Sequence, residues 1–212
     1  MRSLSTLLLT LASMTPSRAL AEPELAQFRE PPNAGWKSYD SDGGIVLERR
    51  TVPGSAFFEH RATVTLAASP QVVADDLWKS FLERDMDSLK RRDILRQEPN
   101  ELLLYDQIRT PVVSDRDYTM RVRRIVDAAR GRIEIRCESA NEMGPPTPKD
   151  LVRVPIMRGG WMIASEGSGT RLTYYAFSEP GGRIAAFLAR RAQAKRSMAD
   201  VRRMVQRLGR LK

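Results

Sequence analysis

The sequence predicts an α+β fold in which a curved antiparallel sheet wraps around one long C-terminal helix. Between Ile45 and Phe177, short segments of alternating apolar and polar residues recur at the spacing of β-hairpins. One helical stripe interrupts them after Ser69, and the stretch from Gly181 to Lys212 carries a longer apolar repeat at steps of three and four. A long amphipathic helix needs an apolar surface to cover, and a one-sided antiparallel sheet provides one.

The first residues of the chain predict a secretory signal peptide at 1–21. Arg2 precedes an apolar run at residues 4–14, and the small-x-small sequence Ala19-Leu20-Ala21 follows before Glu22. The apolar run is shorter than the ~20 residues that span a bilayer. We therefore expect cleavage after Ala21 and an exported protein, periplasmic in a Gram-negative bacterium or secreted.

The segment at residues 22–35 is rich in proline and has little periodicity, so we expect an irregular N-terminal arm. Residues 36–212 are then expected to form a single domain. Cys137 is the only cysteine, so no internal disulfide is available. The stability of this domain must therefore come from its hydrophobic core.

The expected elements of the domain follow one another at short intervals. A first strand at residues 45–50 turns at Pro53-Gly54 into a second strand at 58–66, where apolar and polar residues alternate. Ser69 is a predicted helix N-cap, with Pro70 at the first helical position of a helix that ends near Glu83. Further strands are expected at residues 94–97, 101–109, 115–126, 132–139, 151–163 and 170–177, with a loop at 144–148 and the C-terminal helix over 183–208.

The C-terminal helix is predicted to be amphipathic and strongly basic. Its segment has ten Lys and Arg residues against Asp200 alone, which gives +9, the whole formal charge of the protein. One interpretation is a core-packing helix whose solvated face is basic. Another adds contact between that face and anionic lipid headgroups, at roughly 1 kcal/mol for each nearby cation. The candidates for membrane contact are Arg190, Arg191, Lys195, Arg202 and Arg203.

The remaining composition argues against catalysis, metal binding and nucleic-acid binding. His60 is the only histidine and lies among apolar neighbours on a predicted strand, so we expect a core histidine with satisfied hydrogen bonds rather than a base. His60 and the lone Cys137 provide neither metal-ligand spacing nor a Cys–His pair. The basicity is confined to the last segment of a protein expected to be exported, so nucleic acid is not an expected partner. We expect no cofactor, no metal, no catalytic residue and no enzymatic activity.

Four motifs occur in the order and spacing of a known family. They are Thr110-Pro-Val-Val-Ser-Asp-Arg-Asp-Tyr118, Val152-Arg153 with Gly159-Gly160-Trp161, Thr170-Arg-Leu-Thr-Tyr-Tyr175, and Glu179-Pro180-Gly181-Gly182-Arg-Ile184. Over about residues 36–208 the chain resembles the START domains (steroidogenic acute regulatory protein-related lipid transfer). It departs from the family where Ala185 and Ala186 replace a proline after the last glycine.

The resemblance implies a helix-grip fold with a hydrophobic tunnel between the sheet and the C-terminal helix, holding one sterol, phospholipid or other lipid. Side-chain parity on the predicted strands selects the inward-facing residues, although a filled core would use the same ones. Arg116 shares the inward parity, and we expect it either to meet the polar end of a ligand or to pair with Asp93 or Asp106. The ligand-binding candidates are Phe58, His60, Arg116, Tyr118, Met120, Val122, Ile133, Ile135, Leu172, Tyr174, Ile184, Phe187 and Leu188.

We therefore expect a non-enzymatic monomer that binds, and transfers, a single hydrophobic ligand in a cavity closed by its C-terminal helix. Transient contact with an anionic membrane surface would accompany transfer. Two alternatives stay open: an enzyme that acts on a hydrophobic substrate in the same cavity, and a signalling or interaction module that uses the basic helix.

Overall fold

A computed structural model describes residues 35–83, 86–110 and 113–208 of the chain. The expected signal peptide and residues 22–34 of the expected arm lie outside these ranges and remain predictions. The elements are β1 (Lys37–Asp42), β2 (Ile45–Thr51), β3 (Phe58–Leu66), α1 (Pro70–Leu82), β4 (Leu89–Glu98), β5 (Glu101–Ile108), β6 (Arg116–Asp127), β7 (Arg132–Ser139), β8 (Val152–Arg153), β9 (Ile156–Glu166), β10 (Gly169–Glu179) and α2 (Ala186–Leu208), with short 3-10 turns at Ala128–Arg130 and Asn141–Met143.

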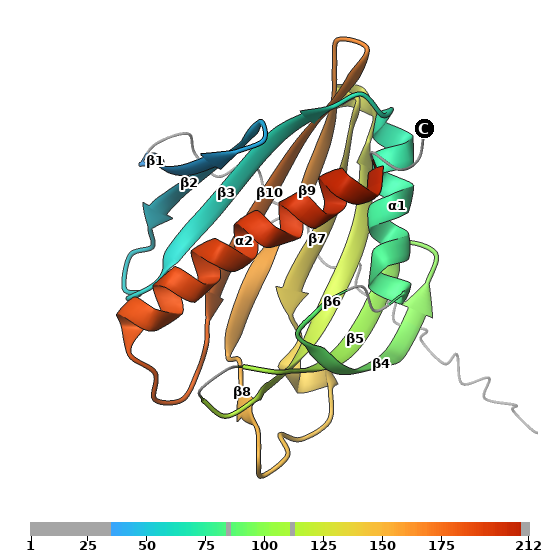
Figure 1. The fold of residues 1–212 in the computed structure, drawn as a ribbon. Coiled ribbons are helices and arrows are strands. Elements are labelled where there is room, and N and C mark those ends of the chain that lie inside the picture. Colours follow the sequence, from blue (N-terminus) through green and yellow to red (C-terminus); the bar gives the residue numbers. More distant parts are fainter. Residues whose placement is uncertain (1–34, 84–85, 111–112, 209–212) are drawn as a thin grey trace, which may run out of the picture. The chain divides into compact units, whose positions relative to one another are not determined.

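The strands of the described residues form a single sheet. Its order is β1-β2-β3-β10-β9-β7-β6-β5-β4, antiparallel at every step, and the two-residue β8 pairs in parallel with β6. The sheet curves, and α2 crosses its face diagonally towards α1 (Figure 1). The predicted α+β arrangement of a curved antiparallel sheet with a long C-terminal helix is thus confirmed. Neither helix described is long and apolar enough to cross a membrane.

The core lies between the covered face of the sheet and the two helices. Each large apolar side chain buried there contributes about 1.5–3 kcal/mol. The sheet supplies Ile45, Leu47, Ala62, Val64, Leu102, Leu104, Val122, Ile133, Ile135, Ile163 and Leu172, α1 supplies Val73, Ala74 and Leu77, and α2 supplies Ala194, Met198, Val201, Met204 and Leu208.

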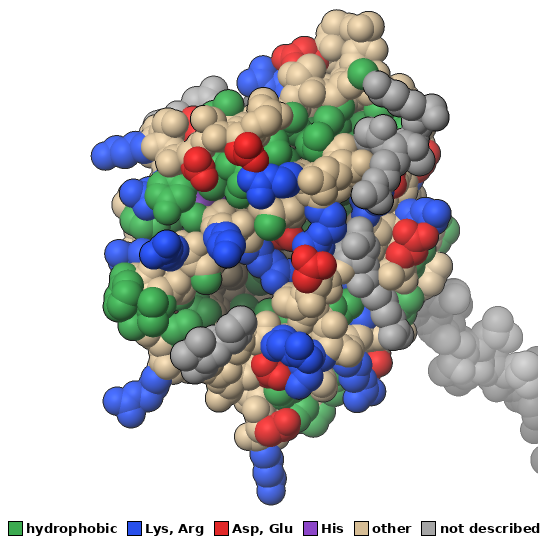
Figure 2. Space-filling model, in the orientation of Figure 1, with side chains coloured by type: hydrophobic (Ala, Val, Ile, Leu, Met, Phe, Trp, Pro, Cys, Tyr) green, Lys and Arg blue, Asp and Glu red, His purple; other side chains and the backbone are tan. Residues whose placement is uncertain are grey.

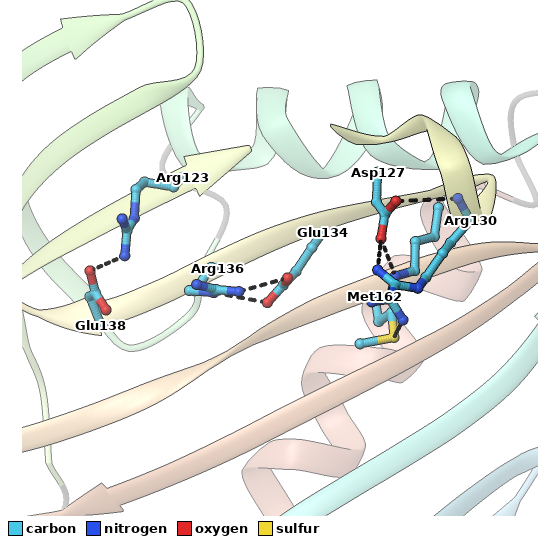
Figure 3. A network of polar contacts seen from close by, with 8 residues as sticks. Arg123, Asp127, Arg130, Glu134, Arg136, Glu138 and Met162 are labelled. Atoms are coloured by element: carbon cyan, nitrogen blue, oxygen red, sulfur yellow. Dashed lines mark hydrogen bonds and ion pairs between the residues drawn. The ribbon is translucent and has the colours of Figure 1, made fainter. Parts of the chain in front are cut away.

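The opposite face of β6 and β7 carries ion pairs instead of apolar side chains (Figure 3). A nitrogen of Arg123 lies 2.5 Å from Glu138, and Arg136 donates two hydrogen bonds of 2.9 Å to Glu134. Asp127 pairs with two arginines at the hairpin end. Most of the apolar side chains of β6 and β7 thus face α2, and most of their polar ones face away from it.

Two strands differ from the prediction. The strand expected over residues 151–163 is divided into β8 and β9 because Pro155, between them, has no N–H for the sheet ladder. The sequence does not predict β1, since Lys37–Asp42 is exposed along its whole length and shows no apolar alternation.

The ends of the helices also refine the prediction. Ser69 occupies the N-cap position of α1, but its hydroxyl makes no capping hydrogen bond, and Pro70 opens the helix. The second helix begins at Ala186 rather than at residue 183. Gly181 and Gly182, with φ of 68° and 61°, hold the preceding chain in a left-handed turn that other residues adopt at a cost.

Candidate functional site: a cavity between the sheet and α2

A cavity of about 520 Å³ lies between the covered face of the sheet and α2. Pockets that hold one small ligand measure about 300–1,000 Å³, so the space suits a single hydrophobic molecule. Its apolar wall includes Phe58, Leu77, Phe81, Met86, Ile108, Met120, Cys137, Val154, Met157, Trp161, Tyr174, Phe177, Ile184, Ala189 and Met204.

The floor of the cavity is made of small residues on neighbouring strands. Ala176 on β10 lies in register with Gly159 on β9, and Gly159 lies in register with Cys137 on β7. A Cβ at Gly159 would lie 2.2 Å from the backbone oxygen of Tyr175, so a larger residue cannot be placed there without moving the strand. These three small residues all line the cavity.

A neutralised polar cluster lies at the wall formed by β4, β5 and β6. Arg92, which is 4% exposed, donates to both carboxylate oxygens of the fully buried Asp106, at 2.7 and 2.5 Å. Burial and the nearby Asp106 carboxylate raise the pKa of Tyr118 well above its usual value. Burial also raises the pKa of Cys137, to about 12. Tyr118 and Cys137 therefore stay neutral, and Arg92 and Asp106 compensate each other.

Arg116 is a buried cation of a different kind. It is 3% exposed and lines the cavity, yet it donates only to backbone carbonyls, those of Ser114 and Pro180, and forms no ion pair with any described carboxylate. The alternative of a pair with Asp93 or Asp106 is wrong, because Asp93 pairs with Arg91 and Asp106 with Arg92. Burial lowers the pKa of Arg116, but a guanidinium remains charged at neutral pH.

His60 is not the satisfied core histidine that the sequence predicts. It is 2% exposed, it lines the cavity, and its Nε2 atom has no hydrogen-bond partner among the described residues. Burial, aided by the positive charge of Arg49, lowers its pKa to about 4. The imidazole is therefore neutral at physiological pH.

The structure brings together about half of the ligand-binding candidates. Those that line the cavity are Phe58, His60, Arg116, Tyr118, Met120, Tyr174 and Ile184. Val122, Ile133, Ile135 and Leu172 share their inward parity but lie in the packed core beyond the cavity wall. Phe187 and Leu188 do not close the cavity: they are 68% and 52% exposed on the first turn of α2.

The face of α2 that does cover the cavity is largely polar, and sequence reasoning missed it. Gln193, Arg196, Ser197 and Asp200 line the cavity at helical spacing. Arg196 bridges Ser88 at 2.6 Å and Asp200 at 3.5 Å. The signal was present in the sequence, since these polar residues lie on the turns between the buried apolar positions of the same helix.

The basic residues of α2 divide into two groups. Arg190 donates to the backbone oxygen of Ala56, Arg202 pairs with Asp42, and Arg203 pairs with Asp87. Arg191 and Lys195 are exposed and form no ion pair with the described residues. Figure 2 shows Lys and Arg side chains gathered along α2, with an apolar patch near its first turn, where Phe187 and Leu188 are exposed.

Comparison with known families matches residues 21–212 to the START domain. Among solved structures, a STAR-related lipid transfer protein from Xanthomonas axonopodis has a TM-score of 0.73 and 25% identity, covering 82% of this chain and 98% of that one. Human StAR-related lipid transfer protein 5 has a TM-score of 0.71 over 87% of this chain and 90% of its own. At 16% identity, this second likeness shows the fold alone.

Two curated relatives are similar over most of their length. An uncharacterized protein of Pseudomonas aeruginosa is 28% identical over 159 residues, which are 73% of this chain and 77% of that protein. The phosphatidylcholine transfer protein of Mus musculus is 25% identical over 170 residues, 77% of this chain and 79% of its own.

Proposed function

Because the chain belongs to the START domain family, whose members bind hydrophobic lipids, we propose that it binds one such ligand beneath α2 and transfers it between membranes without chemical change. The observation that carries the proposal is the largely apolar cavity of about 520 Å³. The match to a relative named as a phosphatidylcholine transfer protein supports transfer. The wall residues that contact the ligand include Phe58, Met120 and Tyr174.

Arg116 is the proposed contact for a charged or strongly polar end of the ligand. A buried guanidinium without a carboxylate is costly, and a hydrogen bond to a charged group contributes about 1.5–3 kcal/mol. A ligand phosphate or carboxylate at this position would compensate the charge. Arg92, by contrast, is already compensated by Asp106 and is not proposed to bind an anion.

The first turns of α2 form the proposed membrane contact. Phe187 and Leu188 would enter the headgroup region, while Arg191 and Lys195 would meet anionic lipids, at about 1 kcal/mol for each cation. Changing both apolar residues to Ser should abolish sedimentation with vesicles containing phosphatidylserine. Val126→Ser, at another exposed apolar residue, is the matched control and should leave sedimentation unchanged.

Export and a monomeric state complete the proposal. The family match begins at residue 21, beside the expected cleavage point, which is consistent with a removable leader before the domain. Sequencing of the N-terminus of the protein recovered from its native compartment tests this directly. An intact Met1 on the functional protein would contradict export by a cleaved signal.

Native mass spectrometry of the protein purified from its own cells tests the ligand. We expect one adduct of lipid mass per chain, released by organic solvent, and transfer of that lipid between donor and acceptor vesicles. A bare protein that takes up no added sterol, phospholipid or fatty acid would overturn the proposal.

The role of Arg116 is tested by measuring how tightly variants of the protein bind a lipid with an anionic group. Arg116→Leu should weaken binding of a lipid with an anionic group by about 10–100-fold, since each 1.4 kcal/mol is a factor of ten. Arg91→Leu, on the exposed part of β4, is the control and should retain binding. Equal affinity in both variants would remove Arg116 from the site.

A further inference from the structure

Two buried polar atoms of the cavity wall have no hydrogen-bond partner in the described part of the chain: Nε2 of His60 and Oε1 of Gln193. His60, on β3, is 2% exposed, Gln193 lies on α2, and both side chains line the cavity. A buried polar atom left unpaired costs about 1–3 kcal/mol. A ligand group that bonded to both atoms would recover this cost.

His60 and Gln193 both lie beside the C-terminal end of β10. His60 is in register with Ala176 on β10, and the amide of Gln193 is bound to Ser178, two residues further along the same face of that strand. Ala176 is in turn in register with Gly159. Ala176 and Gly159 add little side-chain volume at this end of the cavity, which His60 and Gln193 also line.

The hydrogen-bonding network fixes how the Gln193 amide is oriented. Its Nε2 atom donates to the backbone oxygen of Ser178 at 2.7 Å and lies 3.1 Å from the Ser178 hydroxyl oxygen. A backbone carbonyl only accepts, so the atom facing it must be the amide nitrogen. Oε1 is therefore the free atom, and it is an acceptor that requires a donor.

The protonation state of His60 completes the description of the pair. With its pKa lowered to about 4, the imidazole is neutral, so one ring nitrogen donates and the other accepts. The pair thus offers an acceptor on Gln193 and an uncharged imidazole nitrogen. It carries no positive charge that would attract an anion.

We propose that His60 and Gln193 form a subsite for a neutral hydroxyl group of the bound lipid. The hydroxyl donates a hydrogen bond to Oε1 of Gln193, and its oxygen faces Nε2 of His60. A phosphodiester or a carboxylate at neutral pH has no proton to donate and would place its oxygens against Oε1. This subsite is made by residues other than Arg116, which lies on β6 and donates to the backbone oxygen of Pro180, two residues beyond Ser178.

This inference rests on the proposed lipid-binding function. A matched pair of probes tests the hydroxyl subsite separately from lipid binding itself. Dodecan-1-ol and its methyl ether have the same chain, but only the alcohol can donate a hydrogen bond. Binding is followed by intrinsic tryptophan fluorescence, to which Trp161 in the cavity wall contributes. We expect the alcohol to bind about 10-fold more tightly than the ether, the effect of one hydrogen bond to a buried acceptor.

Substitutions then assign that preference to the subsite. Gln193→Met should reduce the alcohol-to-ether ratio to about 1 by weakening the alcohol alone, and His60→Phe should reduce it as well. Gln206→Met, at an exposed position of α2 outside the cavity, is the control and should keep the ratio. Thermal melting of each variant verifies that it is folded.

The outcomes that contradict the subsite differ from those that contradict lipid binding. Equal binding of both probes to the unmodified protein would overturn the subsite and leave the proposed function standing. A preference for the alcohol that survives Gln193→Met and His60→Phe would overturn it too, because the hydroxyl would then be recognised elsewhere. If the protein binds neither probe, and native mass spectrometry shows no bound lipid, the proposed function and the subsite are both wrong.

Discussion

Removing the carboxylate of Asp106 should destabilise the fold by several kcal/mol, because it leaves the charge of Arg92 buried without a partner. The two side chains are 0% and 4% exposed, and both carboxylate oxygens accept from the guanidinium, at 2.7 and 2.5 Å. Asp106→Asn keeps the size of the side chain but removes its charge. Breaking a buried pair in this way costs about 3–5 kcal/mol. That is a large part of the ~5–15 kcal/mol that stabilises a typical domain.

Urea unfolding at pH 7, followed by circular dichroism, measures this cost. A loss of about 4 kcal/mol lowers the midpoint by about 2 M when the denaturant slope is near 2 kcal/mol per molar. Asp93→Asn is the matched control, since Asp93 pairs with Arg91 at 2.8 Å but the side chains are 36% and 59% exposed. An exposed pair contributes about 0–1 kcal/mol. Equal midpoint shifts in the two variants would refute the reasoning.

Further predictions concern the cavity floor and wall. Burial lowers the pKa of His60 to about 4, so between pH 6.5 and 4 the unfolded chain binds a proton at His60 that the folded chain does not. The free energy of unfolding should therefore fall by about 3 kcal/mol over that range, relative to the His60→Phe variant. Parallel pH dependences would contradict this. Gly159→Ala should lower the melting temperature and reduce lipid uptake, whereas Gly167→Ala, at an exposed turn, should leave uptake unchanged. Cys137, with a thiol pKa of about 12, should react slowly with iodoacetamide at pH 8 until the chain is unfolded; rapid labelling of the native protein would argue against the raised pKa.

Most of the fold is predictable from the sequence because alternation on a half-covered sheet is a strong signal. The stretch Phe58–Leu66 is predicted and observed as a strand with the same bounds, and Pro70 opens the first helix as predicted. The strand Lys37–Asp42 gives no such signal, since it is exposed throughout and is defined only by its pairing with β2. Its presence depends on tertiary context rather than on local pattern.

The site is less predictable because parity assigns a side chain to a face of the sheet but not to a depth. Met120 and Val122 share a face of β6, yet only Met120 borders the cavity, whereas Val122 is covered by the core. On α2 the apolar pattern alone directs attention to Phe187, while the cavity is covered by Gln193, a polar residue that the pattern treats as solvated. The pairing of Asp106 with Arg92, which leaves Arg116 without a carboxylate, appears only in three dimensions.

The uneven burial of α2 gives the helix an anchored end and a loosely held end. Its C-terminal half inserts Met198, Val201 and Met204 into the core. Its first turns, by contrast, are held by the buried Ala189 and by a hydrogen bond from Arg190 to the backbone oxygen of Ala56. Local opening follows the distribution of buried apolar contacts. Opening of the first turns of α2 is therefore predicted to cost less free energy than opening of its C-terminal half. Under the proposed function, the rate of lipid exchange and the global stability would then depend on different contacts of the helix.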